Sequence, residues 1–457
     1  MDQGKLKPPV WNDELYLEYH RGCYTTQAET KKLIRQSEEL LQNAEKFASL
    51  SFLEKHSYPQ SEFEESWKKV LFDHFHDIMP GSGVAVNYVD AARNLREVEL
   101  QGEKALHASL DELAAHVNTQ GAGVPVIIYN PLSWERTEPV VVEAQMPAAV
   151  QHVEIQDASG KPLLSQVIST DAATHRVKLR VLAAKVPALG YKVLRVVSSA
   201  NTAGTVSPLK ASTTTLENEF LTLKIDPKTG CITSLINKSD GKEILAAGGC
   251  GNLLQAFVDK PARQDAWEIK FDEKSWDLKE PQEVKLVESG PVRATVQVKH
   301  KFQNSTIVQE INLYAGVPRV DINMHVDWHE HHILLKAAFA ADVQSNFATY
   351  EIPYGAIQRP TTRNTPAEQA KFEVPALRWG DLSDATHGFS LLNASKYGYD
   401  AKANVIRLSL LRSATYPMDA KMTLPRSQTR ACTTSHMRCI RTPAIGRRAT
   451  PCSRVMR

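Results

Sequence analysis

The spacing of hydrophobic residues changes once along this chain, near residue 118, and that change constrains the fold more than any other feature. Before it, apolar residues recur every three or four positions, which is typical of amphipathic helices. After it, short runs rich in valine, isoleucine and leucine are separated by turn residues, which is typical of strands. The sequence therefore predicts an α+β multidomain protein whose helical part precedes its β part.

Residues 25–117 contain three helical patterns with short connections, which predict a three-helix bundle. The second helix is expected to begin at Ser61, because Glu64 follows three residues later as in a capping box, and to be stopped by Pro80. The third is expected from about Val86 to Val117. The residues expected to face the bundle core on these two helices are Phe63, Trp67, Val70, Leu71, Phe75, Ile78, Tyr88, Val89, Ala92, Leu95, Val98, Leu106, Leu110 and Leu113.

The β part divides at two linker-like stretches, residues 118–125 and 198–208. We expect a small β domain over 124–200 and a large β-sandwich over 208–419. Strands without interleaved helices indicate antiparallel sheets stacked face to face. Two polar, turn-rich stretches, "DKPARQDAWEI" and "YEIPYGAIQRPT", are predicted to be loops.

The last segment, residues 420–457, differs in composition from everything before it. It holds nine basic residues and no Asp or Glu, so the chain's net charge of +2 leaves −7 for the first 419 residues. Its apolar residues follow neither period. One interpretation is a basic arm for nucleic acid or an acidic surface. The favoured one is a basic tail without folded structure, or one translated out of frame, and nothing upstream indicates nucleic acid.

The remaining bulk properties concern location. No apolar run reaches membrane-spanning length, and the N-terminus has no secretory signal pattern. Six cysteines in 457 residues do not indicate a disulfide framework, which favours a reducing cytosol. We therefore expect a cytoplasmic protein with no membrane partner, and homo-oligomerisation stays open.

The segment "LFDHFHDIMPGSG" places Asp73, His74, His76 and Asp77 in five positions. A histidine at the end of a rigid element can be held as a metal ligand. On local evidence, a hydrogen-bonded histidine at a helix end is the competing interpretation. One histidine does not make a zinc site, because zinc usually takes three or more protein ligands.

Two further segments are rich in polar side chains. "WNDELYLEYHRGCYTTQ" mixes carboxylates with aromatic residues, a combination that suits sugars, although an ordinary exposed loop explains it equally well. In "HVDWHEHHILLK", His325, Asp327, His329 and His331 alternate, so one strand face would carry all four. We interpret that face as a polar sandwich surface in preference to a metal site.

Taken together, "ELYLEYHRGCYTTQ", "DHFHDIMPGSG" and "WHEHHILLKAAF" with the segments that follow resemble the α-mannosidases of glycoside hydrolase family 38, especially the cytosolic and bacterial branch. The resemblance runs from about Pro9 to Asp419. It implies a retaining exo-α-mannosidase in which a catalytic barrel precedes a three-helix bundle and a galactose-mutarotase-like supersandwich. Residues 1–24 would then be the end of the barrel.

The resemblance also implies roles for individual residues. His76 would bind one zinc ion, whose other ligands come from an early H-x-D motif and from the nucleophilic aspartate. Asp77, His20 and Arg21 would contact the α-mannoside oligosaccharide. Glu14 would be the general acid, with Asp13 as the rival.

The expected H-x-D motif and nucleophile are absent from their place, because the chain begins about ten residues before "ELYLEYHRG". The H-x-D at His325–Asp327 lies in another domain. We therefore expect a truncated and inactive α-mannosidase. The alternatives are a non-catalytic carbohydrate-binding or assembly module, and a degraded gene product without function.

Overall fold

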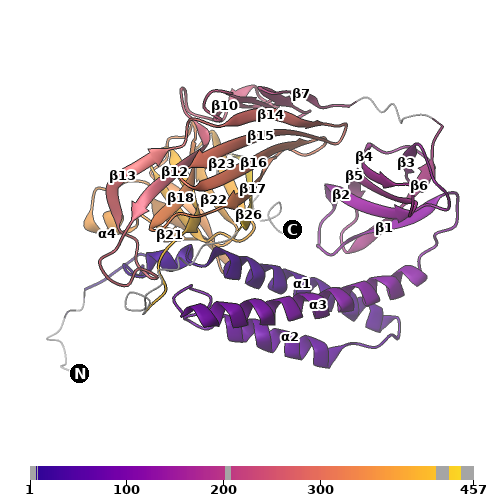
Figure 1. Cartoon of the computed structure of the whole chain (residues 1–457), viewed down its shortest axis with the longest axis horizontal. Coiled ribbons are helices and arrows are strands. Elements are labelled where there is room, and N and C mark those ends of the chain that lie inside the picture. The colour runs from indigo at the N-terminus through magenta and orange to yellow at the C-terminus, as the bar shows by residue number, and fades with distance from the viewer. Residues whose placement is uncertain (1–6, 8, 201–206, 418–431, 444–457) are drawn as a thin grey trace.

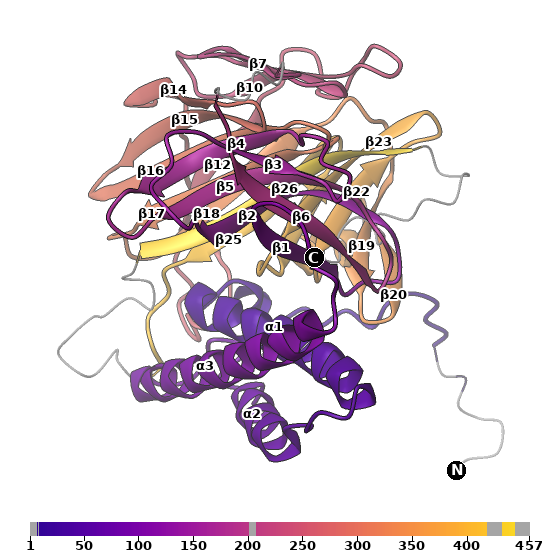
Figure 2. The ribbon, with the colours of Figure 1, turned by 90° about the vertical axis from the view of Figure 1, so that its right-hand side faces the viewer.

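The computed structural model describes residues 7, 9–200, 207–417 and 432–443, which form a helical bundle, a small β domain and a large two-sheet sandwich (Figure 1). The bundle lies along one side of the molecule, with the small domain and the sandwich above it (Figure 2). This confirms the α+β class and the predicted order of domains. Among the described residues, no helix combines the length and apolar character needed to cross a membrane.

The bundle consists of α1 (Ala28–Leu53), α2 (Gln60–Asp73) and α3 (Ala85–Ala115), preceded by a 3₁₀ turn over Arg21–Tyr24. Its core is made by the apolar faces of the three helices, with Ile34, Leu41, Val70, Leu95 and Val98 fully buried. The capping-box prediction is wrong. α2 begins one residue earlier, and the Ser61 hydroxyl bonds Glu62 instead of a backbone N–H.

Three residues predicted to be inward are exposed: Leu71 (61%), Phe75 (53%) and Val89 (67%). Phe75 is exposed because α2 ends at Asp73 and leaves Phe75 in the turn that follows. Leu71 follows the buried Val70 by one position, and that step rotates it about 100° away from the core. The periodic pattern thus continues past the point where the helix stops.

The small β domain packs two three-stranded antiparallel sheets against each other. One contains β1 (Val124–Asn130), β6 (Gly190–Ser198) and β3 (Val153–Gln156), and the other β2 (Arg136–Gln145), β5 (Arg176–Val186) and β4 (Ser165–Asp171). Arg180 of β5 pairs with Glu288 of the sandwich at 2.9 Å, which ties the two β domains together.

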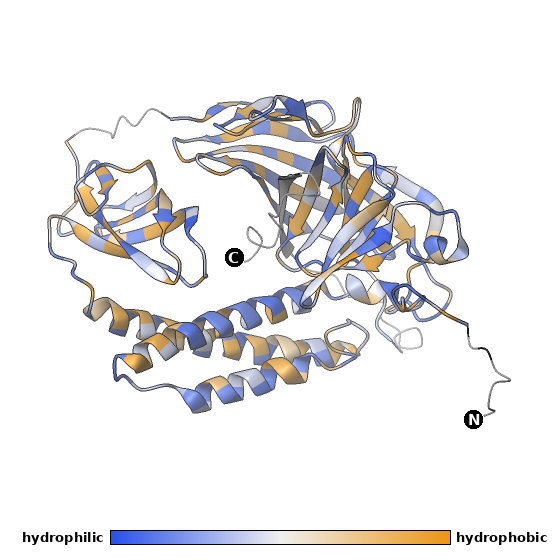
Figure 3. Ribbon diagram, turned by 180° about the vertical axis from the view of Figure 1, so that it is seen from behind, coloured by the Kyte–Doolittle hydropathy of each residue, from blue (hydrophilic) through white to orange (hydrophobic). Residues whose placement is uncertain are grey.

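The sandwich stacks an eleven-stranded sheet on a nine-stranded one, and their facing side chains form the largest core. Its strands alternate hydrophobic and hydrophilic residues (Figure 3). The eleven-stranded sheet runs β21 (Val374–Pro375), β24 (Gly398–Lys402), β25 (Val405–Arg412), β18 (Ile333–Ala340), β12 (Gly251–Asp259), β10 (Ile232–Asn237), β9 (Leu221–Ile225), β8 (Thr215–Glu217) and β7 (Lys210–Ser212), with β11 (Lys242–Glu243) beside β10 and β13 (Phe271–Asp277) beside β12.

The nine-stranded sheet runs β14 (Glu283–Ser289), β15 (Arg293–Phe302), β16 (Ser305–Tyr314), β17 (Val320–Asp327), β26 (Cys432–Pro443), β23 (His387–Asn393), β22 (Trp379–Ser383), β19 (Phe347–Ile352) and β20 (Gly355–Pro360). A short helix, α4 (Pro366–Ala370), follows β20. The loop prediction for "YEIPYGAIQRPT" is wrong, because β19 and β20 pair as a hairpin there. The prediction for "DKPARQDAWEI" is confirmed, since only its first residue belongs to a strand.

The prediction of an unstructured tail over 420–457 is wrong for Cys432–Pro443. This segment is β26, which pairs antiparallel with β17 on one side and β23 on the other. Backbone hydrogen bonding to two flanking strands gives it order that its sequence pattern does not show. The rest of the predicted tail, apart from these twelve residues, lies outside the described part of the chain.

A disulfide joins Cys231 to Cys250, whose Cα atoms are 5.2 Å apart. One bridge is not a framework, but it corrects the expectation of reduced cysteines throughout. Disulfides persist mainly in oxidising compartments, so the cysteines no longer favour the cytosol.

Candidate functional site

The turn between α2 and α3 presents His76 and Asp77 at one end of the bundle. Tyr88 of α3 fixes this turn, because its hydroxyl donates to the Asp77 carbonyl at 3.1 Å and accepts from the Gly83 N–H at 2.6 Å. The Ser82 hydroxyl donates to the Asp77 carboxylate at 3.0 Å. The Asp77 carbonyl is therefore held by α3, and its carboxylate is held by the turn itself.

Lys31 of α1 anchors the same turn from the opposite side. Its buried ammonium donates to the carbonyl oxygens of Thr26, at 2.5 Å, and Met79, at 2.8 Å. Burial lowers the pKa of Lys31 to about 7. Gly81 has φ of +89°, and a Cβ there would lie 2.7 Å from the Thr26 carbonyl oxygen. Only glycine fits this approach without strain.

The His76 side chain is 76% exposed, and its Nε2 lies 3.3 Å from Asp77 Oδ2. This pair offers one imidazole and one carboxylate to a metal ion. Within the described part of the chain, no group of three or more His, Cys, Asp or Glu side chains converges. Zinc usually takes at least three protein ligands, so the described residues do not form a zinc site by themselves.

The other two members of the motif face elsewhere. The Nε2 of His74 lies 2.9 Å from Glu38 of α1, which is an ordinary contact between helices. Asp73 is buried at the end of α2, and burial raises the pKa of its carboxyl to about 6, opposed by a hydrogen bond from Asn94. The motif is thus divided between a structural half and an exposed half.

The segment around Glu14 lies against the sandwich. Both Glu14 carboxylate oxygens accept from the Arg359 guanidinium, at 2.8 and 2.6 Å, and neither is open to protonate a leaving group in this arrangement. Asp13 accepts from Lys371 at 2.9 Å, and this bond holds the pKa of Asp13 below its usual value. A general acid needs a raised pKa, and the lowered pKa of Asp13 is the reverse of this.

Arg21 and His20 also make structural contacts. The Arg21 guanidinium donates twice to the Ala370 carbonyl at the end of α4, at 3.0 and 2.8 Å, and stacks on Phe372 at 4.5 Å. The backbone N–H of His20 donates to the Glu268 carboxylate at 2.9 Å. Glu14 also lines a cleft of about 280 Å³ with Trp11, Tyr16, Glu18 and Lys371, which His76 and Asp77 do not line.

The expected single strand face is only partly present, because β17 ends at Asp327 and leaves His329 and His331 in the loop that follows. His325 and Asp327 of β17 are exposed, while the intervening Val326 is buried. His329 lies 2.9 Å from Asp327, and the described residues around it do not gather into a metal-binding group. These observations agree with a polar sandwich surface.

A buried charge cluster on the sandwich escaped the sequence analysis. The Lys336 ammonium contacts the carboxylates of Glu373 and Asp400, and all three side chains are at most 2% exposed. Arg407 completes the cluster by pairing with Asp400 at 2.7 Å. The signal that could have revealed it is the single lysine inside the apolar strand "ILLKAAFA".

Comparisons with known proteins agree with this architecture. A family model described as "Glycosyl hydrolases family 38 C-terminal domain" matches residues 216–420, and one described as "Alpha mannosidase middle domain" matches 18–113. A crystal structure of an alpha-mannosidase from Enterococcus faecalis V583 superposes with a TM-score of 0.81, covering 93% of this chain and 55% of that chain. Its sequence identity is 15%, so this likeness shows the fold.

The chain is 32% identical over 435 residues to "Alpha-mannosidase 2C1" of Mus musculus, covering 91% of this chain and 38% of that protein. It is 29% identical over 433 residues to "Alpha-mannosidase" of Saccharomyces cerevisiae, covering 34% of that protein. The chain thus spans about two fifths of the length of these relatives or less. These relatives are glycosidases that carry the name α-mannosidase. The chain belongs to glycosyl hydrolase family 38, whose middle and C-terminal domains it contains.

Proposed function

We propose that this chain provides the middle and C-terminal part of a retaining α-mannosidase that releases terminal α-mannose from oligosaccharides. The similarity to named α-mannosidases over more than 400 residues supports the substrate class. In the proposal, His76 is one ligand of a zinc ion and Asp77 contacts mannose hydroxyls. The remaining ligands and the nucleophile come from polypeptide outside the described residues.

The observation that carries this proposal is the exposed His76–Asp77 pair in a turn fixed from both sides. Apolar side chains also stand exposed near it in the sequence: Leu71, Phe72, Phe75, Val86 and Val89. Exposed apolar patches of this kind mark surfaces that other polypeptide covers. A rigid polar pair with an apolar surround suits a half-site that a further domain completes.

Retaining hydrolysis needs a nucleophilic carboxylate and a proton donor about 5–5.5 Å apart. Within the described residues, the carboxylate paired with His76 is that of Asp77, which already accepts a hydrogen bond from Ser82. We therefore expect residues 1–457 alone to show no turnover of a chromogenic α-mannoside, with or without zinc. Hydrolysis at a rate typical of glycosidases would contradict the proposal that the site is incomplete.

A fusion tests the positive half of the proposal. The part of mouse α-mannosidase 2C1 outside the matched region would be joined to this chain, and zinc-dependent mannosidase activity is expected. His76→Ala should then lower kcat by about 100-fold or more, because a lost ligand costs at least as much as a lost supporting contact. His107→Ala, on the exposed face of α3, is the matched control. If the fusion does not fold, the same test is made in mouse α-mannosidase 2C1 itself, by replacing with alanine the histidine that aligns with His76.

A second candidate function is carbohydrate binding without catalysis. Its support is the cleft of about 280 Å³ lined by Trp11, Tyr16, Glu14 and Glu18, which combines aromatic faces with carboxylates. Titration with a mannose oligosaccharide should then quench tryptophan fluorescence, and Trp11→Ala should remove the change.

A cytoplasmic location stays a prediction, and the Cys231–Cys250 disulfide is the observation against it.

A further inference from the structure

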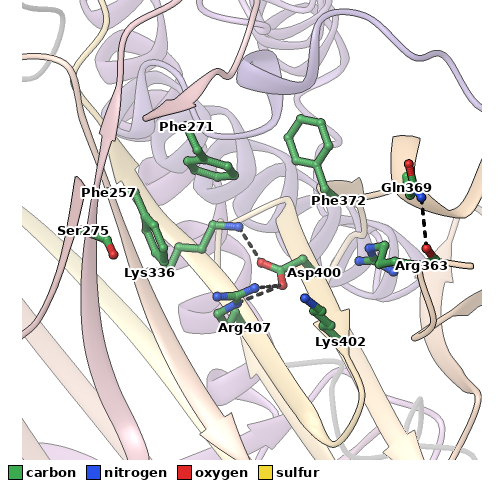
Figure 4. Close-up of a pocket in the computed structure, with 10 residues that line it drawn as sticks. All are labelled: Phe257, Phe271, Ser275, Lys336, Arg363, Gln369, Phe372, Asp400, Lys402 and Arg407. Carbon is green, nitrogen blue, oxygen red and sulfur yellow. Dashed lines mark hydrogen bonds and ion pairs between the residues drawn. The ribbon is translucent and has the colours of Figure 1, made fainter. Parts of the chain in front are cut away.

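A pocket of about 410 Å³ opens on the outer face of the eleven-stranded sheet (Figure 4). Four adjacent strands, β24, β25, β18 and β12, together with β13, form its floor. The chain around α4 forms its rim through Arg363, Gln369 and Phe372. This volume falls within the range of small-molecule sites.

Strand register explains why charged side chains collect on this floor. Lys336 is opposite Gln255, Ala338 is opposite Arg407, and Arg407 is opposite Asp400. Residues directly opposite each other, and those two positions along a strand, share one face. The other face of these strands belongs to the sandwich core, so the charged residues all lie on the outer side.

The charges of the pocket do not cancel. Lys336 and Arg407 are balanced by Asp400 and by Glu373, which lies behind Lys336. Two further cations line the pocket, Lys402 and Arg363, and neither pairs with a carboxylate among the described residues, although the Arg363 guanidinium donates to four backbone carbonyls. The local excess is two positive charges, which suits an anion such as a phosphate or carboxylate.

Donors for such an anion remain available. The Lys336 ammonium uses two of its three N–H groups on Glu373 and Asp400. Arg407 uses Nε and Nη2 on Asp400, while its Nη1 makes only a long 3.5 Å contact with Gln255. Among the residues that the structure describes, the Lys402 ammonium has neither a hydrogen bond nor an ion pair. Three cationic groups can therefore donate into the pocket.

Aromatic side chains line another part of the pocket. Phe271 packs against Phe257 at 5.2 Å and against Phe372 at 5.8 Å, which makes a continuous row of rings. Ser275 and Gln369 add a hydroxyl and an amide at its margins. Aromatic faces beside small polar groups bind the C–H faces and hydroxyls of sugar rings.

We propose that this pocket binds a monosaccharide that carries a phosphate or a carboxylate group. The ring lies on Phe271 and Phe372, and the anion meets Lys402 and Arg407. This site is separate from the His76 turn, so the inference does not depend on the mannosidase proposal.

Isothermal titration of the full chain tests the proposal with four probes: mannose 6-phosphate, glucuronate, mannose and inorganic phosphate. One of the two anionic sugars should bind with Kd below about 1 mM, and mannose and inorganic phosphate should each bind at least about tenfold more weakly. The stronger anionic sugar identifies whether phosphate or carboxylate is preferred. Lys402→Glu should weaken binding at least about tenfold by reversing an unpaired charge.

Lys242→Glu, an exposed lysine on β11 outside the pocket, is the control and should leave the Kd unchanged. Phe372→Leu keeps the wall apolar but removes the ring, and should weaken the anionic sugar while leaving inorganic phosphate unaffected. The proposal is overturned if neither anionic sugar binds, if inorganic phosphate binds equally well, or if Lys402→Glu matches Lys242→Glu.

Discussion

The turn at His76 and the charge cluster at Lys336 contain the same kinds of side chain in opposite settings. At the turn, the imidazole is 76% exposed and has one carboxylate beside it. In the cluster, Lys336 is 1% exposed and contacts two carboxylates. Buried charges must be paired within the fold, whereas water solvates exposed charges and leaves them able to bind a partner. The comparison shows that the cluster has its partners among the described residues, whereas we propose that the turn is completed by further polypeptide.

The largest expected effect comes from breaking the complete region. Lys336→Met leaves Glu373 buried without a cation and Asp400 with Arg407 alone, and should reduce the free energy of unfolding by about 3–5 kcal/mol. Urea unfolding of the full chain measures the loss. Burial already raises the pKa of Glu373, so protonation of this carboxyl should make the loss smaller at pH 5 than at pH 8.

Lys301→Met on β15 is the control for this experiment, because Lys301 is exposed. It should change stability by less than about 0.5 kcal/mol. Equal effects from the two lysine substitutions would show that the cluster is not held together by charge.

Gly81→Ala tests whether the turn at His76 is as rigid as the contacts indicate. The new Cβ would lie 2.7 Å from the Thr26 carbonyl oxygen, at a φ of +89°. We expect a loss of about 1–3 kcal/mol, measured by urea unfolding. Gly241→Ala is the matched control, since Gly241 also has positive φ, +68°, but nothing within 4 Å of a Cβ. A loss of stability no greater than that of the control would mean that the backbone at Thr26 moves to accommodate the new Cβ, and that the turn is not rigid.

Asp73→Asn compares the buried half of the motif with its exposed half. The folded-state pKa of about 6 is above the ordinary 3.8, so the folded protein binds more protons between these values and its stability falls as pH rises through them. The variant should therefore be more stable than the original by about 1–2 kcal/mol at pH 7, and equal to it near pH 3. Thermal unfolding across this range measures the difference, with exposed Asp111→Asn as the control.

Sequence patterns were sufficient where each element is decided locally. The strand "VPVIIYN" coincides with β1, and α3, at Ala85–Ala115, lies within two residues of the bounds expected for it, Val86 and Val117. The patterns failed where partners distant in sequence decide. Pairing with β17 and β23 orders β26, and the end of α2 at Asp73 leaves Phe75 exposed in the turn that follows.

The candidate site shows the same limit. The carboxylates of "WNDELYLE" look like sugar-binding groups in sequence, yet Asp13 and Glu14 bond to Lys371 and Arg359, more than 300 residues away. No local pattern indicates those partners. The exposure of His76 could not be predicted from the sequence either, because it depends on α2 ending at Asp73, three residues before His76.

The smallest expected effect on stability is that of His76→Ala, and its smallness is informative. An exposed imidazole whose polar contact among the described residues is a partly exposed carboxylate should contribute less than about 0.5 kcal/mol to folding. Thermal unfolding of the isolated chain should therefore not distinguish the variant, while the fusion described above should lose its activity. A structural histidine would give the reverse result, with lowered stability and activity lost only in proportion to unfolding. Measuring both in the same variant separates a residue that supports this fold from one that serves a site completed elsewhere.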